Sequence, residues 1–387
     1  MRRFGGPSTS IEPPGALVGY ALPMRIGLAV SSNKFTGAAA VAEHWCRALH
    51  TAGHEAQLLF VGGANLERRL SGSNWALPNL VKERRPGDIR SNFHALLNLG
   101  VHSDVVVTTL PHDHLEAVLA GVPKQTRLVR AFRNPRHLRR DPLHRWAGRK
   151  CTAALAPFHG LETQTRRLIG GRPTTSIPVP VEERFRPGPA PPEARRRLGI
   201  DPTKPLIGMV GKMAKGRGFE MLLDAAAKAR QSCSILAVGH GELQPALERR
   251  AKNLEILDHV TWAGKREEDL PLLFAAMDAV VFAAPGSDWG HRAISEAQAC
   301  GCPVITLSLP GVEDLVDHEH NGLIVEDVSA ITAAFDRLIE DPNLGQRLSH
   351  GAIRSSVDRR FEVIGRRLGI FLEALDQHPG FPDGGTR

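Results

Sequence analysis

From residue 24 onward, short runs of aliphatic residues alternate with segments of helical periodicity. In the first half this pattern predicts strands at Arg25–Val30, Ala56–Val61, Val105–Leu110 and Arg127–Phe132, with helices at Ala38–Leu49 and His114–Ala120. Strand–helix alternation of this kind indicates a parallel sheet whose strands are joined by right-handed helical crossovers. The pattern therefore favours a doubly wound α/β domain.

The second half repeats the same pattern. It predicts strands at Leu206–Val210, Ile235–Val238, Val260–Trp262, Ala279–Ala283 and Val304–Leu307, with helices near 219–230, 242–252, 267–276 and 291–299. Between the halves, five of the seven residues from Arg186 to Pro192 are Pro or Gly, which is typical of a linker. A chain of 387 residues is also long for one hydrophobic core. We expect two Rossmann-like domains that face each other across a ligand-binding cleft.

The ends of the chain and its cysteines set the expected boundaries and compartment. The apolar patch at Ala16–Leu22 is short, follows two prolines and lacks a clear cleavage site, so a disordered leader, or a start at Met24, is favoured over a signal peptide. Five cysteines and the lack of an apolar run of about 18 residues favour a reducing, cytoplasmic location. The predicted segments are a leader (1–23), an N-terminal Rossmann-like domain (24–187), a linker (188–204), a C-terminal Rossmann-like domain (205–360), a helix (361–378) and a tail (379–387).

Charge divides the chain into unlike halves. Residues 1–200 hold 29 Lys and Arg against 14 Asp and Glu, whereas residues 201–387 are acidic overall. Within 127–150 there are nine basic residues, which are Arg127, Arg130, Arg133, Arg136, Arg139, Arg140, Arg145, Arg149 and Lys150, against the single acid Asp141. No helix-turn-helix, zinc or RNP pattern accompanies them, which argues against nucleic acid as the partner. An anionic acceptor or peripheral contact with the inner face of an anionic membrane is favoured.

The stretch from Ser287 to Val304 concentrates the chemistry. It crosses a Gly-containing loop after a buried strand and enters a helix near His291, so free backbone N–H groups and a positive helix end would face the cleft. Gly290 would let a ligand approach the backbone. Asp288 and Glu296 are offset by about 80° if the helix covers most of their spacing, so both could accept hydrogen bonds from vicinal hydroxyls. Taken alone, they could equally be a helix-start residue and a surface acid paired with Arg292.

Further motifs accompany this stretch in a fixed order. They are Phe185-Arg-Pro187, Gly211-Lys212 with Arg217-Gly-Phe219, Val238-Gly-His-Gly-Glu242, Val260-Thr-Trp-Ala-Gly264, Gly311-Val-Glu313 and Asn321-Gly-Leu-Ile-Val325. Together with the acid-x7-Glu element and its Ala-x-Ala-x-Gly-x-Pro-Val sequel, they resemble the signature of retaining glycosyltransferases of family four (group 1). The resemblance spans residues 24 to about 375. It implies the GT-B fold, in which two Rossmann-like domains face each other across a cleft. The N-terminal domain (24–187) would bind the acceptor and the C-terminal domain (205–360) the nucleotide sugar, and the helix 361–378 would return to the N-terminal domain.

The resemblance assigns roles to individual residues. It implies that Lys212 and Arg217 hold the donor diphosphate, that Glu296 binds the ribose hydroxyls and that Asp288 contacts the donor sugar. The donor site would also include Gly211, Gly239, Gly264, Gly290, His291 and Arg292. It further implies transfer with retention of configuration, with the departing diphosphate deprotonating the acceptor, and no metal or other cofactor is then required.

Several positions depart from the family pattern. Asp288 replaces the commoner Glu, the two diphosphate cations are exchanged in type, and Thr36-Gly37-Ala38 has one glycine where two are frequent. Arg133 stands where many members have a histidine; arginine cannot act as a general base at neutral pH, but it can stabilise an anionic acceptor. Gly37, Arg133 and His112 are the expected acceptor or cleft residues. His112 with His114 is only half of a metal site, and no metal site is predicted.

We therefore expect a glycosyltransferase that moves a sugar from a nucleotide sugar to a glycan or lipid-linked acceptor, in cell-envelope polysaccharide or glycolipid assembly. The first strand is not followed by G-x-G-x-x-G, which counts against a nicotinamide dehydrogenase. Two alternatives stay open. One is a GT-B enzyme that remodels a nucleotide sugar, such as an epimerase, and the other is a binding protein for polyanions or nucleic acid without catalytic activity. The sequence leaves the nucleotide base, the sugar, the acceptor, the linkage and the oligomeric state undetermined.

Overall fold

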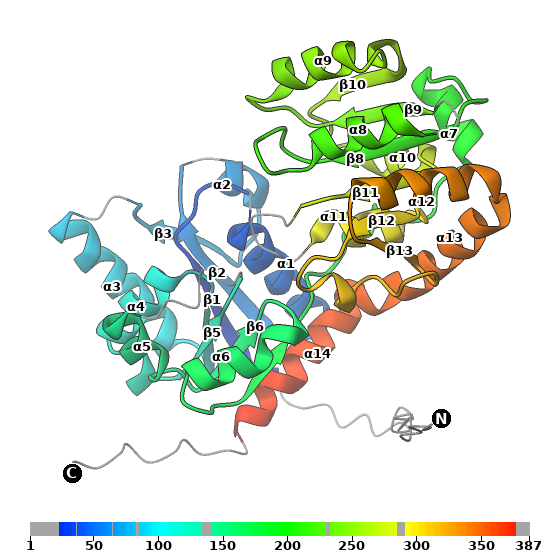
Figure 1. Cartoon of the computed structure of the whole chain (residues 1–387). Helices are drawn as coiled ribbons and strands as arrows, with labels where there is room; N and C mark the ends of the chain where they lie inside the picture. Colours follow the sequence, from blue (N-terminus) through cyan, green and yellow to red (C-terminus); the bar gives the residue numbers. More distant parts are fainter. Residues whose placement is uncertain are drawn as a thin grey trace, which may run out of the picture.

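The protein forms two parallel sheets, each covered by helices on both faces (Figure 1). The computed structural model describes residues 23–35, 37–63, 65–82, 85–133, 141–229, 233–284 and 291–376. The first sheet has seven strands in the order β3-β2-β1-β4-β5-β6-β7. They are β1 Arg25–Val30, β2 Glu55–Val61, β3 Ala76–Leu80, β4 Val105–Thr108, β5 Arg127–Ala131, β6 Ala153–Ala156 and β7 Thr174–Ser176. All paired strands are parallel, as the strand–helix alternation predicts.

The second sheet has six strands in the order β10-β9-β8-β11-β12-β13, again all parallel. They are β8 Leu206–Val210, β9 Ser234–Val238, β10 Val260–Gly264, β11 Ala279–Phe282, β12 Val304–Leu307 and β13 Gly322–Val325. In both sheets the strand order reverses next to the first strand of the domain, at β1/β4 and β8/β11. The carboxyl edge at such a reversal is where open α/β sheets bind ligands.

The helices supply the layers on either side. Those of the first half are α1 Ala38–Thr51, α2 Asn65–Leu70, α3 Pro86–Val101, α4 Pro111–Leu119, α5 Pro142–Gly148 and α6 Glu162–Leu168. Those of the second half are α7 Pro191–Leu198, α8 Phe219–Lys228, α9 Gln244–Asn253, α10 Leu270–Ala276, α11 Arg292–Ala299, α12 Val328–Glu340, α13 Pro342–Ser356 and α14 Phe361–Glu373. Helix α7 lies inside the predicted linker 188–204, where its buried Ala194 and Arg195 pack beside α10. Prolines at its first turn begin this helix instead of preventing it.

The chain crosses between the domains twice. The first crossing comprises residues 177–190, between β7 and α7. The second runs from α13 through the 3₁₀ turn η6 (Val357–Arg359) into α14. Figure 1 shows α14 leaving the C-terminal domain and lying along α1 of the first domain. Its apolar face, which comprises Phe361, Ile364, Leu368 and Leu372, is part of the same core as Ile26, Leu28, Trp45 and Phe60. The N-terminal core is therefore assembled from both ends of the chain.

Further hydrogen bonds and packing contacts also join the two domains. The backbone N–H of His159 donates to Asp314 Oδ2 at 2.7 Å, and Arg184 Nη1 donates to the carbonyl oxygen of Glu267 at 2.5 Å. The ring of Phe158 lies against Gly311, where an added Cβ would come within 2.6 Å of Cγ. Gly311 has a φ of 85°, which a glycine adopts without strain. These contacts bring the carboxyl edges of the two sheets toward each other.

Candidate functional site

Helix α11 leads from the carboxyl end of β11 into the inter-domain region. Asp288 and Gly290 belong to the loop before it and lie outside the described residues. His291 begins the helix with a left-handed φ of 46° and is 2% exposed. Its Nε2 donates to the carbonyl oxygen of Pro310 at 2.9 Å, and its ring meets Phe282 edge-on at 5.2 Å. These contacts hold the start of α11 in place.

Glu296 and Arg292 form an ion pair on the next turn of α11, with Arg292 Nε 3.2 Å from Glu296 Oε1. The sequence offered this i,i+4 pairing with Arg292 as the alternative to a ligand-binding role for Glu296. Glu296 is only 7% exposed, and this burial raises the pKa of its carboxyl group, although the positive charge of Arg292 works in the opposite direction. A buried carboxylate with one cationic partner can still accept hydrogen bonds from a hydroxylated ligand.

Three of the predicted donor-site glycines meet at the carboxyl ends of β8, β9 and β10. The N–H of Gly211 donates to the Val238 carbonyl at 3.0 Å, and the N–H of Gly239 donates to the Gly264 carbonyl at 2.8 Å. A Cβ on Gly239 would lie 1.8 Å from the oxygen of Gly211, so these loops pack backbone against backbone. Gly211 itself has no neighbouring atom within 4 Å of the place where a Cβ would stand. The open side of Gly211 leaves space for a ligand near the backbone.

The two predicted diphosphate cations flank these loops. Lys212 is more than half exposed, and its Nζ lies 3.1 Å from Glu242 Oε2 at the end of β9. Arg217 precedes α8, and its N–H donates to the carbonyl of Ala214 at 3.2 Å. Both cations therefore stand on the loop after β8, at the carboxyl edge of the second sheet.

In the N-terminal domain the predicted acceptor residues lie at the carboxyl ends of β1, β4 and β5. Gly37 opens α1 with a φ of 53°. His112 lies in the first turn of α4 and keeps a third of its side chain exposed, with Nε2 3.3 Å from Asp113 Oδ1. Asp113 in turn accepts from the N–H of Ser31 at 3.0 Å and from the Ser31 hydroxyl.

Arg133 is the predicted acceptor residue that the structure places in a different environment. It is 1% exposed, and its guanidinium lies 5.2 Å from the ring of Trp45. In this conformation it is a buried cation beneath the carboxyl edge, so contact with an acceptor would require its surroundings to open.

A buried cluster at the domain junction was not predicted from the sequence. His44 of α1 is 1% exposed and lies between the stacked rings of Phe35 and Phe361, at 5.8 and 5.7 Å. Its Nδ1 donates to the Ala40 carbonyl and lies 2.8 Å from Glu43 Oε2, and its Nε2 is 3.5 Å from Glu182 Oε1. Burial acts to lower the pKa of His44, but the two carboxylates outweigh it and the pKa is raised.

Arginines from both domains surround this cluster. Arg69 of α2 and Arg184 of the first crossing each bind Glu182, at 3.0 Å. The guanidinium of Arg69 lies 4.0 Å from the centre of the Phe35 ring, and that of Arg292 lies 6.0 Å from the same ring. These are cation–π distances. The Phe35 ring therefore lies near arginines of both α2 and α11. The only hint in the sequence is a histidine within an alanine-rich apolar helix, because Glu182 is far away along the chain.

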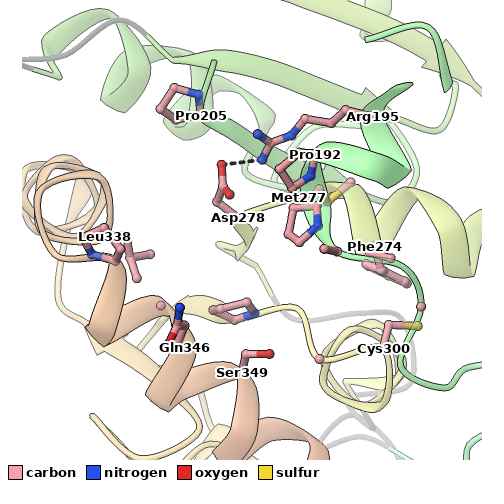
Figure 2. Close-up of a pocket in the computed structure, with 18 of the residues that line it drawn as sticks. Pro192, Arg195, Pro205, Phe274, Met277, Asp278, Cys300, Leu338, Gln346 and Ser349 are labelled. Atoms are coloured by element: carbon pink, nitrogen blue, oxygen red, sulfur yellow. Dashed lines mark hydrogen bonds and ion pairs between the residues drawn. The ribbon is translucent and has the colours of Figure 1, made fainter. Parts of the chain in front are cut away.

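One cavity in the described structure, of about 660 Å³, lies at the amino edge of the second sheet, opposite the predicted site. It is bounded by the first crossing at Pro187–Pro192, by α10 and by α13 (Figure 2). Arg195 reaches across its wall to Asp278, with Nη2 2.6 Å from Oδ2, and Gln346 and Ser349 lie on the facing helix. It contains none of the predicted site residues. Among the described residues no group of three potential metal ligands is found.

Known proteins similar to this chain point to one family. Residues 191–355 match the model of Glycosyl transferases group 1. The match lies within the C-terminal part of the chain and includes helix α11. The sequence resemblance is thereby confirmed, and the motifs that carry it surround α11 and the glycine loops.

Individual relatives agree with this assignment. A D-inositol 3-phosphate glycosyltransferase of Frankia alni is 34% identical over 186 residues, which are 44% of this chain and 45% of the relative. An alpha-D-kanosaminyltransferase of Streptomyces kanamyceticus is 25% identical over 305 residues, which are 72% and 75% of the two chains. The chain thus spans less than half the length of the first of these relatives.

The fold of the whole chain resembles solved glycosyltransferase structures. Anabaena HepE in complex with UDP superposes with a TM-score of 0.79 at 19% identity, covering 91% of this chain and all of the other. The chain therefore has the two-domain GT-B fold that the sequence predicts.

Proposed function

We propose that this protein moves a sugar from a nucleoside diphosphate sugar to an acceptor hydroxyl and retains the anomeric configuration. The observation that carries the proposal is Glu296, a buried carboxylate on α11 at the carboxyl edge of the second sheet. The glycine loops after β8, β9 and β10 meet at this edge and leave open space beside Gly211. Two hydroxyls of a ribose are suitable hydrogen-bond donors for such a carboxylate.

The difficult step is cleavage of the bond between the anomeric carbon and the diphosphate oxygen. Negative charge grows on the departing diphosphate, and Lys212 and Arg217 stand on the loop where they can stabilise it. One preorganised group of this kind typically contributes about 3–4 kcal/mol. The departing oxygen then takes the proton of the acceptor hydroxyl, which attacks from the same face and so retains the configuration. These two cations supply the stabilisation without a metal ion.

The acceptor is proposed to lie against the basic N-terminal domain and to belong to a cell-envelope glycan or glycolipid. The helix α5 supports contact with an anionic membrane. It exposes about half of Leu143 and of Trp146, and Arg145, Arg149 and Lys150 are exposed beside them. Tryptophan and basic residues are the types that favour the membrane interface. No described helix is long and apolar enough to span a bilayer. The basic residues Arg136, Arg139 and Arg140 lie outside the described residues.

The experiment that tests this function is a thermal-shift panel with UDP, GDP, ADP, dTDP and NAD. A ligand at 100 times its Kd stabilises the folded state by about 2.7 kcal/mol, so binding of one nucleotide will be visible. The matching nucleotide sugars are then assayed with the wild type and with Glu296→Gln. The exposed Glu362→Gln on α14 serves as the control.

We expect Glu296→Gln to lose at least about tenfold in kcat/KM, equivalent to one charge-assisted hydrogen bond, and Glu362→Gln to lose nothing. Stabilisation by a nucleotide without sugar transfer, but with interconversion of the sugar, would instead favour an epimerase. Failure of every nucleotide, with stabilisation by polyanions, would favour a binding protein.

A further inference from the structure

The two inter-domain crossings meet at Arg359. Its backbone carbonyl accepts a hydrogen bond from the N–H of Val181 on the first crossing, at 2.9 Å. Arg359 itself lies in η6, between α13 of the C-terminal domain and α14 on the N-terminal domain. Arg359 therefore links the two segments whose backbone angles set the angle between the domains.

The side chain of Arg359 extends into the C-terminal domain. It is 5% exposed, and its Nη2 donates to Oε1 of Gln298 at 2.5 Å. Its Nε has no hydrogen-bond partner among the described residues, and the neighbouring Asp358 acts on it through its charge without an ion-pair contact between the two side chains. Burial lowers its pKa to about 10, so the group is still charged at neutral pH. A buried charge without a carboxylate partner is costly, which makes stability a poor reason for placing it here.

Gln298 transmits the position of Arg359 to the donor helix. It is fully buried near the end of α11, and its Nε2 donates to the carbonyls of Leu315 at 3.0 Å and Asn321 at 3.5 Å. An eight-residue helix with continuous backbone hydrogen bonds moves as one body. A shift of Gln298 therefore shifts Glu296, two residues earlier on the same helix. The last turn of α11 is also the negative end of its helix dipole, which favours a cation such as Arg359 near that turn.

We propose that Gln298 and Arg359 are positioning residues that fix α11 relative to the two crossings, so that the placement of Glu296 depends on the angle between the domains. Neither residue touches the substrate. The proposal rests on the proposed function, because Glu296 matters only if α11 carries the donor site. It predicts that loss of the pair and loss of the Glu296 carboxylate act on the same site, so that their effects on sugar transfer do not add.

The first test needs no substrate. Hydrogen exchange of the full-length protein is compared for wild type, Arg359→Met and Arg359→Lys, with Arg360→Met as the exposed neighbouring control. We expect Arg359→Met to exchange about tenfold faster in both α11 and the segment 178–187, as loss of one buried hydrogen bond would allow. Arg359→Lys, which keeps the charge and a donor, should restore most of the protection. Faster exchange confined to residues 355–361 would overturn the proposal.

The second test separates positioning from simple structural support. With the nucleotide sugar identified by the panel, we expect Arg359→Met to lower kcat/KM about tenfold, and the double variant Arg359→Met with Glu296→Gln to lose no more than Glu296→Gln alone. A lower Tm with unchanged kcat/KM would show a purely structural pair, and losses that add in the double variant would show that Arg359 does not act through Glu296. Either result overturns the proposal.

Two outcomes need a substitute experiment, namely a variant that does not fold and a wild type that transfers no sugar. If Arg359→Met does not fold, Gln298→Met takes its place, because it removes the same buried hydrogen bond from the other partner. If the wild type transfers no sugar from any donor, the proposed function has failed, and the exchange experiment still decides whether the crossings and α11 are mechanically linked.

Discussion

Gly365 of α14 lies directly against the backbone of Ala48 in α1. A Cβ on Gly365 would stand 1.9 Å from the carbonyl oxygen of Ala48 and 3.1 Å from Cβ of Ala52. The two helices therefore approach so closely that only a residue without a side chain fits between them. Through this contact α14, which follows the second crossing, packs closely on the N-terminal domain.

Replacing Gly365 by alanine should destabilise the N-terminal domain by about 1–3 kcal/mol, because the helix must move away from a backbone atom that cannot yield. Gly345→Ala in α13 is the matched control, since nothing lies within 4 Å of its Cβ position. That variant should be neutral or gain about 0.5–1 kcal/mol from helix propensity. Thermal and urea denaturation measure both. Equal stability of the two variants would contradict the close packing.

Glycine substitutions can also locate the donor nucleotide. Gly211→Ala should leave the Tm unchanged, because its Cβ would enter open space, but should weaken nucleotide binding about tenfold or more if the ligand uses that space. Gly239→Ala should lower both stability and binding, because its Cβ would meet the oxygen of Gly211. Tm and calorimetric Kd are measured for each variant. Full nucleotide affinity in Gly211→Ala would place the ligand elsewhere.

The junction around His44 should make stability depend on pH. Its pKa is raised in the folded state, so its contribution is complete below the ordinary value of 6.5 and is lost as pH rises through the folded pKa. The difference in unfolding free energy between wild type and His44→Gln should therefore shrink between pH 6.5 and more alkaline values. Urea titrations across that range measure it. A difference that stays constant with pH would show that His44 is neutral in the folded protein.

The stabilisation by Glu182 should depend on pH in the opposite direction to that by His44. Burial acts to raise the pKa of its carboxyl group, but His44 and the neighbouring arginines outweigh burial and hold that pKa well below its usual range. Its stabilisation should be present above pH 4.5 and fall away as the solution becomes more acid. Glu182→Gln should lose stability near neutrality and converge with wild type in acid, as followed by fluorescence. Parallel acid transitions would contradict this.

The exposed face of α5 should decide binding to membranes. Trp146→Ala together with Leu143→Ser should weaken binding to vesicles containing anionic lipid about tenfold or more, given the apolar surface removed. Replacing the exposed Leu257 of the C-terminal domain by Ser should have no effect. Co-sedimentation at two salt concentrations measures this. Equal binding of all variants would exclude α5 as the contact.

Chelation tests the predicted independence from metals. We expect EDTA to leave sugar transfer unchanged, because Lys212 and Arg217 are placed to neutralise the departing diphosphate. Dialysed enzyme is assayed with and without added Mg²⁺ or Mn²⁺. A strong requirement for either ion would show that the two cations are insufficient.

The regular part of the fold could be predicted because periodicity is a local signal. Strands such as Arg25–Val30 and Leu206–Val210 agree to the residue, since both are continuous aliphatic runs. Strand β6 was missed because it is mostly alanine, which has weak strand propensity, and β3 because it contains Pro78. Pro78 is tolerated there because β3 is an edge strand.

The site was predictable only where its residues lie close together in the sequence. Glu296 and Arg292 are on one helix, and the glycine loops follow their strands directly. The pairs His44–Glu182 and Gln298–Arg359 join residues 138 and 61 positions apart, and no local pattern marks them. Only the tertiary fold brings them together.

The position of α14 has a consequence for biosynthesis. Domains usually fold in the order in which they leave the ribosome. Here the face of α1 that packs on α14 has no partner until residues 361–373 have emerged, after the strands of the C-terminal domain. The N-terminal domain of the pair therefore completes its core after the domain that follows it. A fragment ending before Phe361 would release the C-terminal domain with its sheet intact and leave the N-terminal domain with an apolar groove along α1.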